Sequence, residues 1–253
     1  MKLARAPLEK LVSGSTETFG DALVGVYLHG SAALGCYGPR SDVDVVVALE
    51  RPSTAEEQAW LANLCLDVSR PTGQDDTHCL LELDAVVAPS LVPWRYPTPL
   101  DFHYGESFRQ AFERGDAKPW RVDESTDLAA HLTILDAAGI VLVGPPVASV
   151  FPTVPLADYR ASIQVDRQWC LDHLDTHRLH VVLSLPRVWA GLETNDVHSK
   201  ATAAEWALPQ LPPALRPVLD HALAVYRGKA EESWDGLPVD DYVAFLVARI
   251  PAT

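Results

Sequence analysis

The chain has 253 residues, of which 48% are hydrophobic, so it can bury a substantial core in one large domain or two smaller ones. Its formal net charge of −14 repels phosphate backbones, which argues against a nucleic-acid partner and favours a cationic ligand such as an amino sugar or a metal ion. No segment has the length and apolar character of a signal peptide or a transmembrane helix, so we expect a cytoplasmic protein without a membrane partner.

The N-terminal part of the chain mixes strand and helix patterns. Residues 22–28 are rich in β-branched and apolar side chains and end at a Gly-Ser dipeptide, as expected of a buried strand followed by a tight turn. Residues 88–122 are rich in proline and aromatic residues and show no clear periodicity, so we expect loops there. We predict strands at 22–28, 42–49, 79–87 and 140–143, and helices at 8–20, 32–37, 54–68 and 125–138.

The C-terminal part of the chain shows only helical periods. The segment FPTVP, at 151–155, indicates a linker between the two patterns. The sequence therefore predicts an α+β protein with an α/β N-terminal domain over residues 1–152 and an all-helical C-terminal domain over residues 153–253. The predicted helices of the second domain are 156–175, 178–191, 200–209, 213–228 and 238–250.

Four cysteines are widely separated along the chain, and none belongs to a CxxC pair or lies near histidines at zinc-finger spacing. This spacing predicts reduced thiols and argues against a disulfide framework or a zinc site. The residues concerned are Cys36, Cys65, Cys79 and Cys170.

The segment HGSAALG, at 29–35, places a glycine and a serine directly after a predicted strand. Gly30 lets the backbone approach a phosphate closely, and the hydroxyl and backbone N–H of Ser31 can hold triphosphate oxygens near a helix N-terminus. A Gly-Ser turn on its own is usually only a turn. Its significance depends on the acidic residues that follow.

Asp42 and Asp44 follow in the segment RSDVD, at the start of a very apolar strand. Because they are two residues apart on a strand, they face the same side, and their carboxylates can share one or two Mg²⁺ ions. Two such ions would stabilise both the attacking and the leaving oxygen of a phosphoryl displacement. A D-x-D pair can also be a solvated strand edge, but two aspartates on so apolar a strand cost stability unless a cation or hydrogen bonds compensate them. The combination therefore predicts a site for a nucleoside triphosphate and Mg²⁺.

Gly-Ser, a spacer and D-x-D form the signature of the nucleotidyltransferase superfamily of DNA polymerase β type, which this chain resembles. It resembles more closely the aminoglycoside 3″/9 adenylyltransferases, an antibiotic-resistance family that modifies streptomycin and spectinomycin. The resemblance implies a polymerase-β-like domain, with a mixed sheet flanked by helices, followed by a helical bundle. It also implies transfer of AMP from ATP to an antibiotic hydroxyl, with Mg²⁺ as cofactor and release of pyrophosphate. The segments that carry it extend over nearly the whole chain: GVYLHGSAALG, PRSDVDVVV, LELDAVVAPSLVPWRYP, FHYGE, LVGP, LPRVW, KATAAEW and LPPALRPVLDHALAVY.

The resemblance also assigns roles to individual residues. Glu82 occupies the position of a third acidic residue, which binds metal with the two aspartates and accepts the proton of the substrate hydroxyl. Asp84 shares its strand face and is a rival, and a solvent-facing carboxylate is the alternative for Glu82. The residues expected to contact ATP are Gly30, Ser31 and Ser41 in the first domain and Arg187, Lys200 and Tyr226 in the second. Without the resemblance, the last three also fit a surface arginine, a solvated lysine and a half-buried core tyrosine.

For the antibiotic, the resemblance points to acids and aromatic side chains that bind ammonium and guanidinium groups, together with Glu82. Trp169, with Asp172 or Asp175, matches the tryptophan and aspartate that the family uses for streptomycin, once a gap is placed in the alignment. His180 is a further candidate in a histidine-rich region, where surface histidines fit the same pattern.

Ser107 directly follows FHYGE, at a position where streptomycin-modifying relatives have tryptophan, so a narrower or different substrate range is expected. Two other interpretations are open. The same chemistry could act on another amino-cyclitol or on a protein side chain, or the chain could bind a nucleotide or an aminoglycoside without catalysis. The expected partners are ATP and a small polycationic antibiotic, and we expect a monomer.

Overall fold

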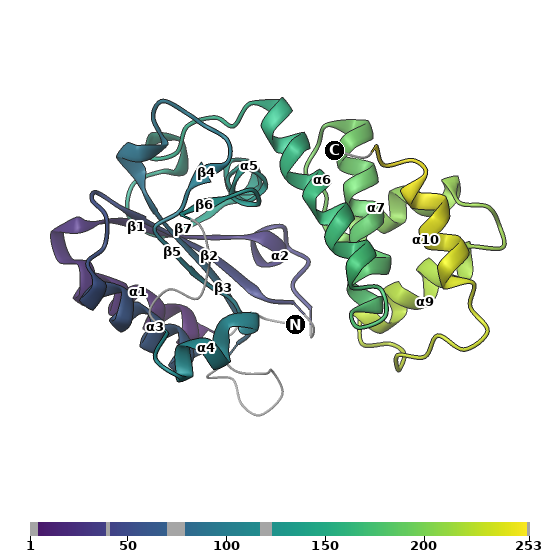
Figure 1. Ribbon diagram of the computed structural model, residues 1–253, viewed down its shortest axis with the longest axis horizontal. Coiled ribbons are helices and arrows are strands. Elements are labelled where there is room, and N and C mark those ends of the chain that lie inside the picture. The colour runs from purple at the N-terminus through teal and green to yellow at the C-terminus, as the bar shows by residue number, and fades with distance from the viewer. Residues whose placement is uncertain (1–4, 39–40, 70–78, 117–122, 252–253) are drawn as a thin grey trace. The chain divides into compact units, whose positions relative to one another are not determined.

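The structure is a computed structural model that describes residues 5–38, 41–69, 79–116 and 123–251. The chain forms two compact units, Met1–Val154 and Pro155–Thr253. The first holds a mixed sheet with helices and the second is helical, which confirms the predicted fold class (Figure 1). Among the described residues, no helix is long and apolar enough to cross a membrane.

A mixed five-stranded sheet, counted over the described residues, forms the centre of the first unit. Its order is β5-β3-β2-β1-β7, in which β2 and β3 are parallel and every other neighbouring pair is antiparallel. The strands are β1 (Leu23–His29), β2 (Val43–Leu49), β3 (Leu81–Val87), β5 (Phe102–Tyr104) and β7 (Ile140–Val143).

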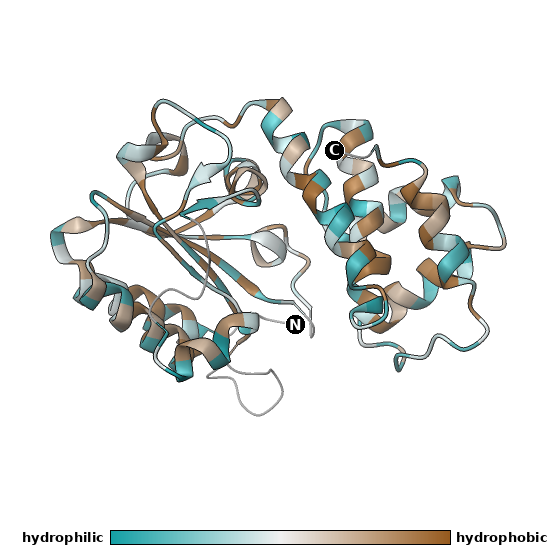
Figure 2. Cartoon of the chain, viewed as in Figure 1, coloured by the Kyte–Doolittle hydropathy of each residue, from teal (hydrophilic) through white to brown (hydrophobic). Residues whose placement is uncertain are grey.

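Helices cover both faces of this sheet, and the side chains of β2 show which face each helix covers. Val43, Val45 and Val47 belong to the core cluster that includes residues of α1 (Arg5–Phe19) and α3 (Ala55–Val68). Val46 and Ala48 belong to the cluster that includes α5 (Leu128–Ala138). This alternation is the two-residue period of a strand buried on both sides. Figure 2 shows the hydrophobic residues concentrated along these central strands.

The predicted elements of the first unit occur with small shifts at their ends, and the loop-rich interpretation of residues 88–122 was wrong in part. Strand β5 and the short helix α4 (Arg109–Glu113) lie in that segment, and β4 (Thr98–Pro99) pairs with β6 (Glu124–Ser125). The short helix predicted at 32–37 begins earlier, as α2 (Gly30–Ala33). A three-residue strand such as β5 is too short to show a period in the sequence.

The second unit is built around α7 (Arg178–Thr194), in which almost every residue from Leu179 to Leu192 is buried. Pro186 lies inside this helix and has no N–H to donate to the carbonyl of Val182, four residues earlier. The hydroxyl of Tyr242 donates to that carbonyl instead, at 2.9 Å, and so ties two helices together. The helices packed with α7 are α6 (Leu156–Asp172), α8 (Lys200–Ala207), α9 (Arg216–Tyr226) and α10 (Val239–Val247).

Candidate active site

The candidate site begins with two carboxylates on neighbouring strands. Asp44 of β2 is the register partner of Glu82 on β3, and on its other side it is the partner of His29 on β1. Residues paired across neighbouring strands point to the same face, so these three side chains form one row. Asp42 was predicted to belong to the strand, but β2 begins at Val43 and Asp42 is exposed just before it.

Gly30 brings the backbone directly against the carboxylate of Asp44. Its φ is +61°, and a Cβ at this position would lie 1.7 Å from Oδ2 of Asp44. No other residue can occupy this position without displacing the aspartate, so the predicted close approach of the backbone is present, with Asp44 as its immediate neighbour.

Ser31 directly follows Gly30 and Ser41 directly precedes Asp42, and the two serines differ in their contacts. The Oγ atom of Ser31 is buried without a hydrogen-bond partner among the described residues. The Oγ atom of Ser41 accepts the N–H of Gly38 at 3.0 Å. A buried hydroxyl without a partner suits a ligand oxygen, because burial without a hydrogen bond is costly. Pro39 and Arg40, which belong to the same motif, lie outside the described residues.

Asp84, the alternative to Glu82 as the third acidic residue, is hydrogen-bonded by two imidazoles. It is only 3% exposed, and its Oδ1 and Oδ2 lie 2.8 Å from Nδ1 of His103 and 2.9 Å from Nδ1 of His131, respectively. The ring of His131 also lies 5.1 Å from the buried ring of His29. Both oxygens of Asp84 are thus engaged, which leaves Glu82 as the carboxylate of β3 that is open to a ligand.

Burial and these contacts set the protonation of the cluster. Burial opposes the charge on Asp84, but hydrogen bonds from the two histidines outweigh it and hold the pKa of Asp84 below its usual range. Burial likewise opposes a charge on His131, yet its hydrogen bond to Asp84 raises the pKa of His131 to about 10. Burial raises the pKa of Glu82, and the charges of His131 and His103 counteract this rise in part. The result is a charged Asp84 held between His103 and His131, with Glu82 beside them.

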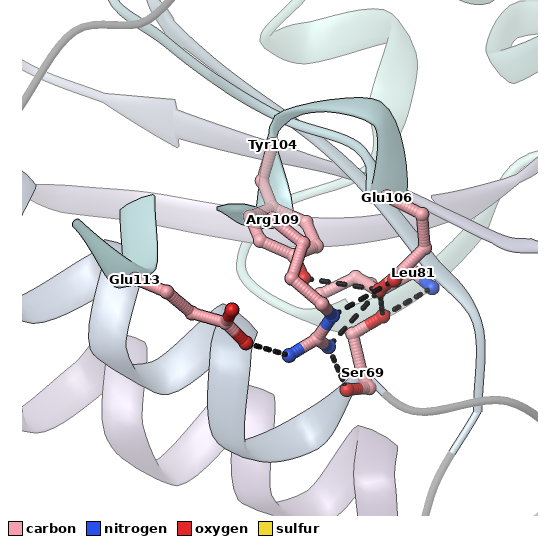
Figure 3. Close-up of polar contacts among 6 residues, drawn as sticks. All are labelled: Ser69, Leu81, Tyr104, Glu106, Arg109 and Glu113. Carbon is pink, nitrogen blue, oxygen red and sulfur yellow. Dashed lines mark hydrogen bonds and ion pairs between the residues drawn. The ribbon is translucent and has the colours of Figure 1, made fainter. Parts of the chain in front are cut away.

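A second polar cluster fixes the beginning of β3, one residue before Glu82 (Figure 3). The Oγ atom of Ser69, at the end of α3, accepts the N–H of Leu81 at 3.1 Å and donates to Glu106. The carboxylate of Glu106 also accepts the hydroxyl of Tyr104 at 3.0 Å and Nε of Arg109 at 2.8 Å. Because Glu106 belongs to the FHYGE segment, this cluster joins that segment to the strand that carries Glu82.

The carboxylate oxygens of Asp44 and Glu82 are the hard ligands that Mg²⁺ prefers. Magnesium sites commonly use one or two protein carboxylates and complete the shell with water and substrate phosphates, so the pair fits such an ion. Over the ranges that the structure describes, no three His, Cys, Asp or Glu side chains are grouped to hold a metal ion. The site with Asp42 as a third ligand therefore stays a prediction.

Arg187 and Lys200, two of the residues of the helical unit that are expected to contact ATP, have partners within that unit. An Nη atom of Arg187 binds Oδ2 of Asp166 at 2.7 Å. The Nζ atom of Lys200, at the beginning of α8, lies 3.2 Å from Nδ1 of His180. Tyr226, on α9, is only 7% exposed. The roles of Arg187, Lys200 and Tyr226 toward ATP stay predictions.

Of the residues of the helical unit that are expected to contact the antibiotic, the structure brings Trp169 and His180 together. Trp169 is 37% exposed, and its ring lies 5.0 Å from that of His180 and 4.3 Å from that of His173, on which it stacks. Asp172 accepts the side-chain amide of Gln168 at 2.8 Å, while the side chain of Asp175 is 96% exposed. The helical unit thus presents an aromatic and imidazole surface in which the two aspartates are peripheral.

His103 and His131 were missed by sequence reasoning. A signal was present, because a charged Asp84 inside an apolar strand needs buried partners. The partners could not be chosen among nine histidines without the pairing of β5 to β3, which places His103, and the packing of α5 on the sheet, which places His131.

The Gly-Ser turn, the paired carboxylates and the mixed sheet define the first unit as a nucleotidyltransferase domain. A family model described as "Nucleotidyltransferase domain" matches residues 10–86, and a second, "Aminoglycoside adenylyltransferase, C-terminal domain", matches residues 149–249. The chain belongs to the aminoglycoside adenylyltransferase family.

Named relatives agree with this assignment. The chain is 35% identical to a spectinomycin 9-adenylyltransferase of Staphylococcus aureus over 87% of this chain and 84% of the relative. It is 32% identical to an aminoglycoside (3″)(9) adenylyltransferase of Escherichia coli over 83% of this chain and 80% of the relative. The crystal structure of spectinomycin adenyltransferase AAD(9) from Enterococcus faecialis with ATP and spectinomycin has the same fold, with a TM-score of 0.87 at 21% identity over 98% of this chain and 99% of that one.

Proposed function

We propose that the protein transfers AMP from ATP to a hydroxyl of an aminocyclitol or aminoglycoside antibiotic, spectinomycin or streptomycin, and releases pyrophosphate. The observation that carries this proposal is the row formed by Asp44 and Glu82 beside Gly30, in a chain of the aminoglycoside adenylyltransferase family. The net charge of −14 supports an acceptor that is cationic.

The proposed reaction is an in-line displacement at the α-phosphorus of ATP. The acceptor oxygen forms a bond to this phosphorus, the bond to the bridging oxygen of the β-phosphate breaks, and pyrophosphate leaves. Glu82 takes the proton of the acceptor hydroxyl, since its neighbour Asp84 has both oxygens engaged by histidines. Burial raises the pKa of Glu82, which makes it a stronger base than an exposed carboxylate and suits a group that accepts a proton.

The nucleotide is proposed to bind along the Gly30 turn. Asp44 and Glu82, with Asp42, would hold Mg²⁺, which supplies charge neutralisation on the phosphate oxygens when it is bound. The unpartnered hydroxyl of Ser31 supports a contact to the triphosphate, and Ser41 would assist it. Arg187, Lys200 and Tyr226 are proposed to contact ATP from the helical unit, on the basis of the family resemblance.

The antibiotic is proposed to use the helical surface around Trp169, with His180, Asp172 and Asp175, because an aromatic ring and carboxylates suit ammonium groups. We further propose a monomer that acts in the cytoplasm, where its co-substrate ATP is made, and that uses no nucleic acid.

A pyrophosphate-release assay with ATP, Mg²⁺ and a panel of acceptors tests the proposal. We expect release with spectinomycin or streptomycin and a mass gain of one AMP on the drug. If pyrophosphate is released only with another amino-cyclitol, or if AMP is found on protein, the acceptor is a molecule other than spectinomycin or streptomycin. Tight binding of the drug without any pyrophosphate would instead identify a binding protein.

Replacement of Gly30 by alanine is expected to lower kcat/KM for ATP by at least about tenfold, because the added Cβ must displace the carboxylate of Asp44. Its positive φ should also lower the free energy of unfolding by about 1–2 kcal/mol. Gly20→Ala is the matched control, since Gly20 also has a positive φ, of +49°, but nothing lies within 4 Å of its Cβ position. The control should lose similar stability and keep its activity. A Gly30→Ala enzyme with unchanged kcat/KM would show that this contact is not needed.

A further inference from the structure

The imidazole of His103 has one nitrogen engaged and one open. Its Nδ1 lies 2.8 Å from Oδ1 of Asp84, and Asp84 is held from its other side by His131. The ring is thereby fixed, with Nε2 on the edge away from Asp84. The side chain of His103 is 22% exposed, and Nε2 makes no hydrogen bond within the part of the chain that the structure describes.

The open nitrogen lies beside Gly105, the residue that directly follows β5. The antiparallel register ends with Tyr104 opposite Leu83, and its continuation by one residue would bring Gly105 opposite Glu82. A Cβ on Gly105 would lie 3.6 Å from Nε2 of His103 and 4.0 Å from Oγ of Ser107; apart from the two chain neighbours of Gly105, no other atom of the described residues lies within 4 Å. The position of Gly105 is therefore not crowded, and the nearest atom to it outside its chain neighbours is the open imidazole nitrogen.

The protonation of His103 suits a contact between its Nε2 and an oxygen-rich part of the acceptor. Burial disfavours a charge on His103, but its hydrogen bond to Asp84 raises the pKa of His103, so Nε2 carries a proton more readily than in a free histidine. A protonated Nε2 donates a hydrogen bond and repels ammonium groups. It would donate a hydrogen bond to a hydroxyl, ether or carbonyl oxygen of the acceptor and leave the cationic groups of the acceptor elsewhere.

We propose that His103, oriented by Asp84, contacts an oxygen atom of the acceptor through Nε2 and so helps to place the hydroxyl that is modified at Glu82. This inference rests on the proposed function. It assigns to His103 a contact with the acceptor and none with ATP, so the two substrates should respond differently when it is replaced.

The two amide substitutions of His103 separate a contact role from a structural one. An asparagine amide reaches the position of Nδ1 and can keep the bond to Asp84, whereas a glutamine amide reaches the position of Nε2. His103→Asn should therefore raise the acceptor KM by about 3- to 10-fold, the loss of one hydrogen bond, with the ATP KM within about twofold of wild type. His103→Gln should restore the acceptor KM to within about threefold of wild type.

The test measures acceptor KM and ATP KM for the wild type, both variants, and His221→Asn and His221→Gln as matched controls in the helical unit, with thermal unfolding curves for each. The inference is overturned if His103→Asn keeps the wild-type acceptor KM, if the order of the two variants is reversed, or if both KM values rise equally. Failure of the proposed function is a separate result, because wild-type enzyme would then release no pyrophosphate with any aminocyclitol. That outcome would remove the inference together with the function.

Discussion

Replacement of Asp44 by asparagine is expected to lower kcat by about 10³-fold while the protein stays folded. The carboxylate of Asp44 lies beside Glu82 in the register of β2 and β3 and against the Gly30 turn, where the phosphates are proposed to bind. An amide of the same shape keeps the packing but removes the charge that would hold Mg²⁺. A metal ion is worth several kcal/mol to a phosphoryl displacement, and about 4 kcal/mol corresponds to roughly 10³ in rate.

The measurement is pyrophosphate release with saturating ATP and antibiotic, together with thermal unfolding of the metal-free protein. Asp21→Asn serves as the matched control, since Asp21 is an exposed aspartate in the same unit, and it should keep full activity. Increased Mg²⁺ should restore part of the activity of Asp44→Asn if the loss comes from weaker metal binding. Wild-type turnover by Asp44→Asn would remove the metal role of this carboxylate.

Part of the row formed by Asp44 and Glu82 could be predicted from the sequence. The strand period correctly placed Asp44 on an apolar strand, although the strand begins one residue after Asp42. The fold class and the order of helices followed from the same kind of pattern. The register of β2 with β3, which makes Glu82 the neighbour of Asp44, depends on which strands pair. Pairing across more than thirty residues of intervening chain is a tertiary property that no local period contains.

The histidines of Asp84 show what could not be predicted. His103 lies on a strand that is too short to show a period in the sequence. His131 lies on a helix whose residues are mostly apolar. Each is significant only through its distance to Asp84. The same limit applies to Arg187, for which the sequence left open a contact with ATP or a place at the surface, and which the structure pairs with Asp166 on the neighbouring helix. Local patterns predict that a buried charge needs a partner, but only the packed fold identifies it.

Loss of the pair between Asp84 and His131 is expected to destabilise the protein in a pH-dependent way. In His131→Phe the ring volume is kept, but the buried Asp84 has only His103 left. Removal of one partner of a buried pair costs about 3–5 kcal/mol, and since the side chain of His131 is 21% exposed we expect about 2–4 kcal/mol at pH 6.

The pH dependence follows from the direction of the two pKa shifts. His131 has its pKa raised to about 10 in the folded protein, above its ordinary value of 6.5, so its contribution is complete below pH 6.5 and is lost as the pH rises toward 10. Asp84 has its pKa lowered, so its contribution is present above about pH 4 and is lost in acid. Urea unfolding of the metal-free, nucleotide-free protein should thus show the largest difference between wild type and His131→Phe between about pH 4 and 6.5. The difference should shrink steadily up to pH 9, and one that stays constant from pH 5.5 to 9 would mean that His131 is not charged in the folded state.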